Sequence, residues 1–430
     1  MVKKSKILAI FDYIIAVALM INCRTIWLTK VPPISKLDGT LWLALLISIL
    51  AIVTLNYQND ESKFQHALII SMFLFFYFGI YIFLSSFPGT RNYGVRYASV
   101  FIMLVWLLYY DDYINDIPGV LLKYKNVIFI VALISLLFWL FGSLLGLIKP
   151  TGAIWTAWTG TGRPASVPSY FGIYFETQSV TTDIGGFIRN TAIYPEAPMS
   201  SLNFCIALGI QVLSKQSNKW GKIQFWILLI AILSTGSTTG YIFLAVLLAF
   251  KINNSNNFLL EKFKSPLFIL ILIFTAISVS YLIHQKTIYG IDSANLRIDD
   301  YKVGYRAWIQ HPILGSGIEN DEYVRQFVEP WRSYNIGFSN SPLKVLSDGG
   351  IYLFLGYLYC FVRGIFLSIY NKDKYKFIFI VLILYLFITT IFHYTYLLFL
   401  LLILKANKTA KKMYPVVEPV DNIAINNIQN

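Results

Sequence analysis

Long runs of apolar residues, separated by short polar segments, make up most of the 430-residue chain. A helix needs roughly 20 apolar residues to cross the hydrocarbon core of a bilayer. About twelve runs are candidates, and they lie near 7–22, 40–55, 67–87, 94–110, 126–148, 198–214, 221–234, 236–250, 266–284, 341–370, 375–391 and 393–404. The pattern predicts an all-α integral membrane protein with about twelve transmembrane helices.

Two stretches leave this count open. Residues 221–250 form two short spans that are interrupted at Ser234-Thr235-Gly236, and the apolar stretch 375–404 is interrupted near His393. If the second stretch crosses only once, the chain has eleven spans. We interpret residues 1–412 as one polytopic membrane domain and predict a disordered cytoplasmic tail over 413–430.

The composition agrees with a membrane protein. Hydrophobic residues make up 57% of the chain and charged residues 13%, whereas a soluble domain carries about 25% charged residues. This excludes a cytosolic enzyme, a secreted disulfide scaffold and a disordered chain. The net charge of +13 does not by itself indicate a nucleic-acid partner, because basic loops also orient membrane proteins.

Lysine predicts the orientation. If the N-terminus is cytoplasmic, every cytoplasmic loop contains lysine, as the positive-inside rule requires, and the C-terminus is cytoplasmic as well. The loops on this side contain Lys63, Lys123, Lys125, Lys215, Lys219, Lys222, Lys251, Lys262, Lys264, Lys372, Lys374 and Lys376.

Arginine is distributed differently. Two long loops, about 149–197 and 285–340, lie on the outer side, and nine of the ten arginines fall outside or at the outer membrane edge. Arginine binds phosphate and carboxylate groups bidentately, so the set favours an outward-facing anion site. The alternative is that long loops translocate regardless of charge and pair their arginines with local Asp or Glu.

Part of the second long loop has helical periodicity. Over 296–312, apolar and aromatic residues recur at spacings of three and four and share one face. They are Ile298, Tyr301, Tyr305, Trp308 and Ile309. We predict an interfacial amphipathic helix that ends at Pro312, with Arg297 at the level of a lipid phosphate and Arg306 on the opposite flank. A plain anchor helix is the alternative.

The residues that follow extend this segment into a longer motif. Tyr301 lies four residues after Arg297, His311-Pro312-Ile-Leu-Gly315-Ser-Gly317 begins fourteen residues after it, and Asn340-Ser-Pro-Leu343 leads to Gly350-Ile351. This pattern resembles the O-antigen ligase and O-antigen polymerase superfamily. Ligases of the superfamily carry a histidine directly before the asparagine, where this chain has Ser339. The difference favours a polymerase.

The end of the first long loop, Ile188-Arg-Asn-Thr-Ala-Ile-Tyr-Pro-Glu-Ala-Pro198, is similar to a second segment of the superfamily. Arg189, Tyr194 and Glu196 match best, and Ala192 replaces a glycine. Glu196 precedes a predicted helix, so it is either a capping carboxylate or a carboxylate beside Arg189 at the mouth of a membrane cavity.

The resemblance implies a metal-independent membrane glycosyltransferase without a cofactor. It would transfer a glycan from undecaprenyl diphosphate to a sugar hydroxyl of another lipid-linked repeat unit at the outer face of the bacterial plasma membrane. Lipopolysaccharide O-antigen or capsule would be the product, and a chain-length regulator and a flippase are candidate partners. A ligase, or a transporter for the same lipid, is the alternative.

The same resemblance assigns roles to residues. Arg189 and Arg297 are the predicted diphosphate ligands, with support from Arg91 or Arg306. Glu196 and His311 are the candidate proton acceptors, and Tyr194, Tyr301 and Asn340 support the site. No two histidines have metal-binding spacing, so we predict no metal.

Overall fold

The computed structural model describes residues 2–29, 36–57, 60–87, 89–156, 165–182, 185–215, 218–254, 280, 291–332 and 338–406. The long helices within these ranges are α1 (Val2–Asn22), α3 (Leu37–Asn56), α4 (Glu61–Leu84), α5 (Thr90–Tyr110), α6 (Gly119–Phe138), α7 (Ala197–Leu213), α8 (Lys219–Ser234), α9 (Thr238–Asn253), α11 (Ile291–Gln310), α13 (Ser341–Tyr370), α14 (Lys374–Thr389) and α15 (Tyr396–Ala406). The shorter elements are α2 (Ile26–Thr29), β1 (Tyr113–Ile114), β2 (Ile117–Pro118), η1 (Trp139–Leu144), α12 (Asp321–Arg325) and η2 (Pro330–Arg332).

A helix is present at every predicted span that falls within the described ranges, which confirms a mostly helical membrane protein. The span predicted near 266–284 lies outside them. The helices α8 and α9 separate at residues 235–237, and α14 and α15 separate at 390–395, as the interrupted apolar runs predict. Six described helices have the length and hydropathy to cross a membrane alone, so the count of eleven or twelve crossings stays a prediction.

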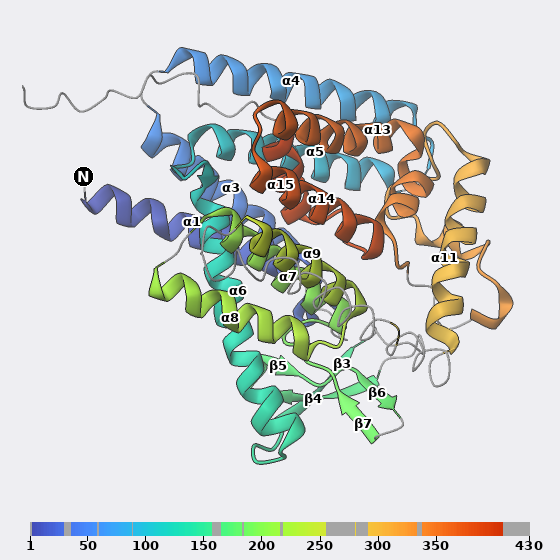
Figure 1. The fold of residues 1–430 in the computed structure, drawn as a ribbon. Helices are drawn as coiled ribbons and strands as arrows, with labels where there is room; N and C mark the ends of the chain where they lie inside the picture. Colours follow the sequence, from blue (N-terminus) through green and yellow to red (C-terminus); the bar gives the residue numbers. More distant parts are fainter. Residues whose placement is uncertain are drawn as a thin grey trace, which may run out of the picture.

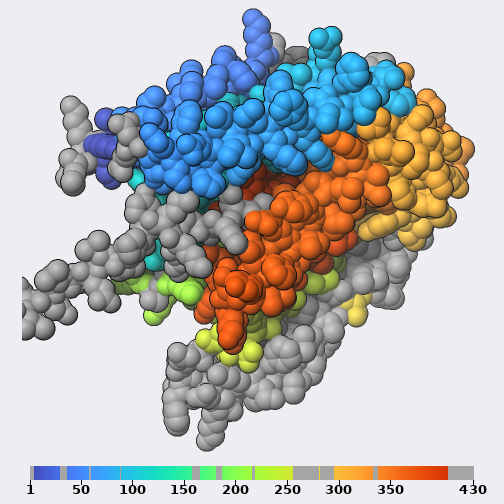
Figure 2. Space-filling view, turned by 90° about the horizontal axis from the view of Figure 1, so that it is seen from above, coloured from blue at the N-terminus to red at the C-terminus, as the bar shows by residue number. Residues whose placement is uncertain are grey.

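The core lies around α7 and α15. Both are buried along most of their length, and α7 packs against α6, α8, α9 and α14, while α15 packs against α1, α5 and α13. In contrast, α4 exposes a row of phenylalanines that includes Phe73, Phe76 and Phe83. Figure 2 shows α4 and α13 on the same face, with residues 291–332 gathered at one end. The exposed apolar row is typical of a lipid-facing helix.

The first long loop contains β-structure that the sequence analysis did not predict. Strands β3 (Gly152–Thr156), β4 (Ala165–Tyr170) and β5 (Tyr174–Phe175) form an antiparallel sheet, and β6 (Ser179–Thr182) pairs with β7 (Gly185–Ile188). In the view of Figure 1 these strands lie beside the lower end of α6 and below α8. Trp139 Nε1 donates to Ile188 O at 2.8 Å, which fastens the end of β7 to η1. Arg189 follows β7 directly.

The predicted amphipathic helix is present as α11, and Figure 1 shows it at the end of the bundle where α13 begins. Its buried face holds Val303 and Ala307, which pack against Val324 and Phe338. The face with Ile298, Tyr301, Tyr305 and Ile309 is turned outward, with these side chains 49% to 56% exposed. An aromatic face that the protein leaves uncovered suits the headgroup region of a bilayer.

The helix α13 changes direction at Gly350, where φ is 60° and ψ is −165°. This region is essentially restricted to glycine. At the kink, Ile351 N donates to Pro312 O at 2.9 Å and Gly317 N donates to Asp348 O at 2.9 Å. A Cβ at Gly315 would collide with the backbone of Asp348. The motif that ends in Gly315-Ser-Gly317 and the motif Gly350-Ile351 are therefore in direct backbone contact. We call this contact between α13 and residues 312–317 the joint.

We predict that Gly350→Ala lowers the thermal stability of the detergent-solubilised protein. An alanine there has a disfavoured backbone conformation, which costs about 1–3 kcal/mol, and its Cβ would collide with Ile313 O. Gly39→Ala on α3 is the matched control, because a Cβ at Gly39 meets no atom within 4 Å. Equal melting temperatures for the two variants would contradict the role of this joint.

Candidate functional site

Arg189 lies in a cradle of carbonyl oxygens. Its Nε donates to Thr235 O at 2.7 Å, its Nη2 donates to Gly236 O at 3.3 Å, and its Nη1 donates to Gln178 Oε1 at 3.2 Å. The same Gln178 oxygen accepts from Ala197 N at 3.0 Å, at the start of α7. The break between α8 and α9 thus holds the arginine, which is 8% exposed.

Arg189, Glu196 and Arg297 are close enough to influence one another. Burial lowers the pKa of Arg189 to about 10, the Glu196 carboxylate opposes this shift, and the Arg297 cation adds to it. Arg297 is half-buried and has neither a hydrogen bond nor an ion pair to the described part of the chain. Two segments about 100 residues apart therefore place a carboxylate and a second cation within electrostatic reach of Arg189.

Glu196 precedes the first residue of α7, but its side chain makes no capping hydrogen bond. Gln178 occupies the first N–H of the helix instead, and the backbone oxygen of Glu196 accepts from Met199 N at 3.1 Å and Ser200 N at 3.2 Å. Of the two interpretations drawn from the sequence, the structure therefore favours a carboxylate that acts on Arg189.

His311 is separated from this cluster. It follows the last turn of α11, fourteen residues after Arg297, which corresponds to about 20 Å along the helix axis. Its ring lies 4.8 Å from Phe87 and 5.4 Å from Tyr323, measured between ring centroids. The structure therefore brings Glu196, but not His311, to the arginines.

Several other outer arginines have acidic partners, as the alternative interpretation expected. Arg306 pairs with Glu329 at 3.0 Å and Arg96 pairs with Asp38 at 2.8 Å. Arg332 is buried between two carboxylates, Asp299 at 2.9 Å and Asp300 at 2.7 Å.

Arg91 is exposed on the first turn of α5. Within the described residues, local pairing therefore accounts for part of the arginine set but not for Arg189 and Arg297.

The three predicted supporting residues have different surroundings. Tyr301 is exposed on the outward face of α11, and Tyr194 is fully buried. Asn340 begins α13, where its Oδ1 accepts from Leu343 N at 3.0 Å. The Tyr194 hydroxyl and the Asn340 amide nitrogen have no hydrogen-bond partner among the described residues.

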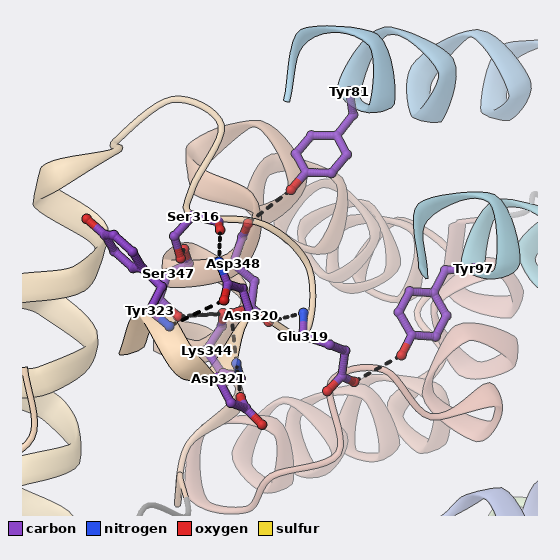
Figure 3. A network of polar contacts seen from close by, with 10 residues as sticks. All are labelled: Tyr81, Tyr97, Ser316, Glu319, Asn320, Asp321, Tyr323, Lys344, Ser347 and Asp348. Atoms are coloured by element: carbon purple, nitrogen blue, oxygen red, sulfur yellow. Dashed lines mark hydrogen bonds and ion pairs between the residues drawn. The ribbon is translucent and has the colours of Figure 1, made fainter. Parts of the chain in front are cut away.

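Lys344 and Asp348 form a buried ion pair on α13, with Nζ and Oδ1 2.8 Å apart. Figure 3 shows that this pair is the centre of a wider network. Lys344 also pairs with Asp321 at 2.7 Å, and Asp348 Oδ2 accepts from Glu319 N at 3.2 Å. Tyr97 on α5 donates to Glu319 Oε1 at 3.0 Å. The network fastens the loop after α11 to α13 and α5.

Residues 223–358 match a protein-family model described as O-antigen ligase. The match covers about a third of the chain and agrees with the resemblance to the O-antigen ligase and O-antigen polymerase superfamily. No curated protein matches it. The matched stretch contains Arg297, His311 and Asn340, whereas Arg189 and Glu196 lie before it.

The structure explains the glycine that this superfamily usually has at position 192. Ala192 has a φ of 49°, in the left-handed region that glycine tolerates best. Its backbone is held on both sides, since Ala192 N donates to Asn190 Oδ1 at 3.1 Å and Phe175 N donates to Ala192 O at 3.0 Å. The turn between Arg189 and Tyr194 therefore has a fixed conformation.

The superfamily assignment does not test the predicted absence of a metal. The described residues contain no group of three or more His, Cys, Asp or Glu side chains that could hold a metal ion. The role of each candidate residue likewise stays a prediction.

We predict that Ala192→Gly is better tolerated than Ala207→Gly. Both variants lose a buried methyl group, worth about 0.8 kcal/mol, but only the change at 192 relieves a left-handed backbone, which costs an alanine about 1–2 kcal/mol. Ala207 lies within α7, where glycine disfavours the helix. Melting temperatures in detergent would test this, and equal losses for the two variants would argue against a strained turn.

Proposed function

We propose that the protein is a polysaccharide polymerase of this superfamily. It would transfer a glycan from undecaprenyl diphosphate to a sugar hydroxyl of another lipid-linked repeat unit, at the outer face of the bacterial plasma membrane. The observation that carries the proposal is the meeting of Arg189 and Arg297 beside Glu196. Arg297 lies on α11, the helix that turns an aromatic face outward.

The proposed reaction needs little beyond charge stabilisation and alignment. The bond between the first sugar carbon of the donor and the diphosphate oxygen breaks, and the acceptor oxygen bonds to that carbon. Negative charge develops on the diphosphate, which the forked guanidinium groups of Arg189 and Arg297 would stabilise. Arg91 and Arg306 are proposed to support binding from a greater distance.

The acceptor hydroxyl also has to lose its proton. Glu196 lies beside Arg189, and a neighbouring cation makes a carboxylate a weaker base. His311 is farther from the arginines along α11. We retain both as candidate proton acceptors, and Glu196→Gln and His311→Gln variants compare them directly.

The orientation and partners belong to the same proposal. Cytoplasmic termini follow from the lysine distribution, and the tail predicted at 413–430 lies outside the described residues. O-antigen or capsule would be the product, and a flippase and a chain-length regulator would act before and alongside the protein.

The ligase alternative is disfavoured by the surroundings of Ser339. Its backbone N–H and hydroxyl both bond to the Asp300 carboxylate, which also binds Arg332. The position at which superfamily ligases have histidine therefore fastens α13 to α11 in this protein.

A deletion strain separates the two enzymatic functions. Loss of a polymerase should leave glycans of single-repeat length on a gel, because finished chains are never made. Accumulation of long glycan that is not attached to its final acceptor would instead identify a ligase and overturn the proposal.

We predict that Arg297→Lys reduces polymer formation by at least ~10-fold, because lysine keeps the charge but loses bidentate binding. Arg189→Ala should have at least the same effect. Arg363→Lys, a matched change near the predicted inner face, is expected to keep wild-type activity. Polymer length would be measured with purified protein and radiolabelled lipid-linked repeat units. Normal activity of folded Arg297→Lys protein would contradict the proposed diphosphate site.

The same assay tests the transporter alternative. Longer glycans from purified protein in detergent indicate a polymerase. Relocation of unchanged lipid across a vesicle membrane, without longer products, would indicate transport.

A further inference from the structure

A buried histidine lies in the segment that connects α14 to α15. His393 is fully buried, and neither of its ring nitrogens has a hydrogen-bond partner among the described residues. The same holds for the hydroxyl groups of its neighbours Thr390 and Tyr394. The sequence analysis treated His393 only as an interruption of the last apolar stretch.

The backbone of this segment, in contrast, is firmly held against the start of α13. Ser341 Oγ donates to Thr390 O at 2.7 Å and accepts from Phe392 N at 2.9 Å. Tyr357 donates to His393 O at 2.7 Å. The unpartnered amide nitrogen of Asn340 belongs to the residue before Ser341. A fixed backbone thus presents polar side-chain atoms whose hydrogen-bonding capacity is unused.

Unpaired polar atoms of this kind are costly. Each buried donor or acceptor without a partner costs about 1–3 kcal/mol, and such groups in native proteins call for a specific explanation. A segment that only connected two helices would lose nothing if these side chains were apolar. Their chemistry, with two hydroxyl groups, an amide donor and an imidazole, matches the donors and acceptors of a sugar.

The surroundings suit a sugar as well. The Tyr394 ring lies 4.2 Å from the His393 ring and stacks on Tyr97 at 4.9 Å, measured between centroids. These rings provide an apolar surface beside the polar atoms, a combination that small-molecule sites commonly use.

The helix α14 connects this segment with the region of the arginine cluster. Arg297 acts electrostatically on Tyr385 of α14, and Tyr385 donates to Thr239 O at 3.5 Å, near the break that holds Arg189. The last residue of α14, Thr389, is four residues farther on, or about 6 Å along the axis. The helix α14 therefore connects the proposed diphosphate site to the segment of His393.

We propose that His393, Asn340, Thr390 and Tyr394 form the subsite for the acceptor sugar, and that His393, rather than Glu196 or His311, accepts the proton of the attacking hydroxyl. This inference rests on the proposed polymerase function. The acceptor oxygen bonds to the donor sugar carbon, the bond from that carbon to the diphosphate breaks with its electrons on the diphosphate, and the proton moves to a His393 nitrogen.

The charges around His393 keep it ready to accept a proton. Arg24, from the connection between α1 and α2, and Lys344, from α13, both act on the ring. The titratable groups that complete the surroundings are Tyr357 of α13 and Tyr394. Because an imidazole must be neutral to accept a proton, activity should decline when acid protonates His393.

The test compares His393→Gln with His66→Gln in the polymerisation assay, using lipid-linked repeat units extracted from the deletion strain. Glutamine keeps hydrogen-bonding capacity but cannot take up the proton, so His393→Gln should be slower by about 10²–10⁴-fold. The acid limb of the wild-type pH–rate profile should also disappear. His66 is exposed on α4, and its variant should match the wild type in rate and in pH profile. A wild-type rate or an unchanged acid limb for folded His393→Gln would overturn the proposal.

Two variants that keep the histidine test the subsite if His393→Gln does not fold. Thr390→Val and Tyr394→Phe should each raise KM for the acceptor several-fold while kcat changes little. An unchanged KM in both would overturn the proposal. If the wild type itself makes no longer glycans, the polymerase function and this inference both fail, whereas an active wild type with an equally active His393→Gln variant removes only the inference.

Discussion

The close contact between residues 312–317 and the kink of α13 determines where the functional segments lie. Backbone atoms meet directly there, because Gly315 and Gly350 carry no Cβ. Lys344 and Asp348 then neutralise each other beside the joint, and a buried pair of this kind fixes geometry more than it adds stability. Since α11 is joined to this loop through Pro312, the joint also sets the position of Arg297.

Arginines on the outer side fall into two electrostatic classes. Arg96, Arg306 and Arg332 contact carboxylates, so their charge is largely cancelled locally. Arg189 is held by carbonyl and amide oxygens, which satisfy its donors but leave its positive charge in place. A buried cation that is positioned by dipoles can still attract an anion, and the low local dielectric strengthens that attraction. The second class therefore has the chemistry that a diphosphate requires.

How much the sequence predicts depends on the range of the interaction. The apolar runs predict the helices, and periodicity predicts the outward face of α11, because both patterns are local. The contact of Arg189 with Thr235 and Gly236 joins residues about 46 positions apart, and no periodicity encodes it. The strands β3–β7 are short and lie in a loop that is rich in Gly, Thr and Pro, so the sequence analysis did not recognise a strand pattern there. His393 could have been singled out from the sequence, because an ionisable residue in an apolar stretch is a functional candidate by default.

The proposed reaction uses two lipid-borne substrates, so donor and acceptor must reach one reaction centre from separate binding sites. The structure offers chemically different surfaces for them. The proposed diphosphate site has the guanidinium groups of Arg297 on α11 and Arg189 after β7. The proposed acceptor subsite has hydroxyl, amide and imidazole groups beside aromatic rings, at the end of α14. The helix α14 packs against α9, which follows the break that holds Arg189, and against α13, which follows Asn340, so its position bears on the alignment of the two proposed substrates. Such alignment is itself a large part of catalysis when the leaving group is already a stable anion.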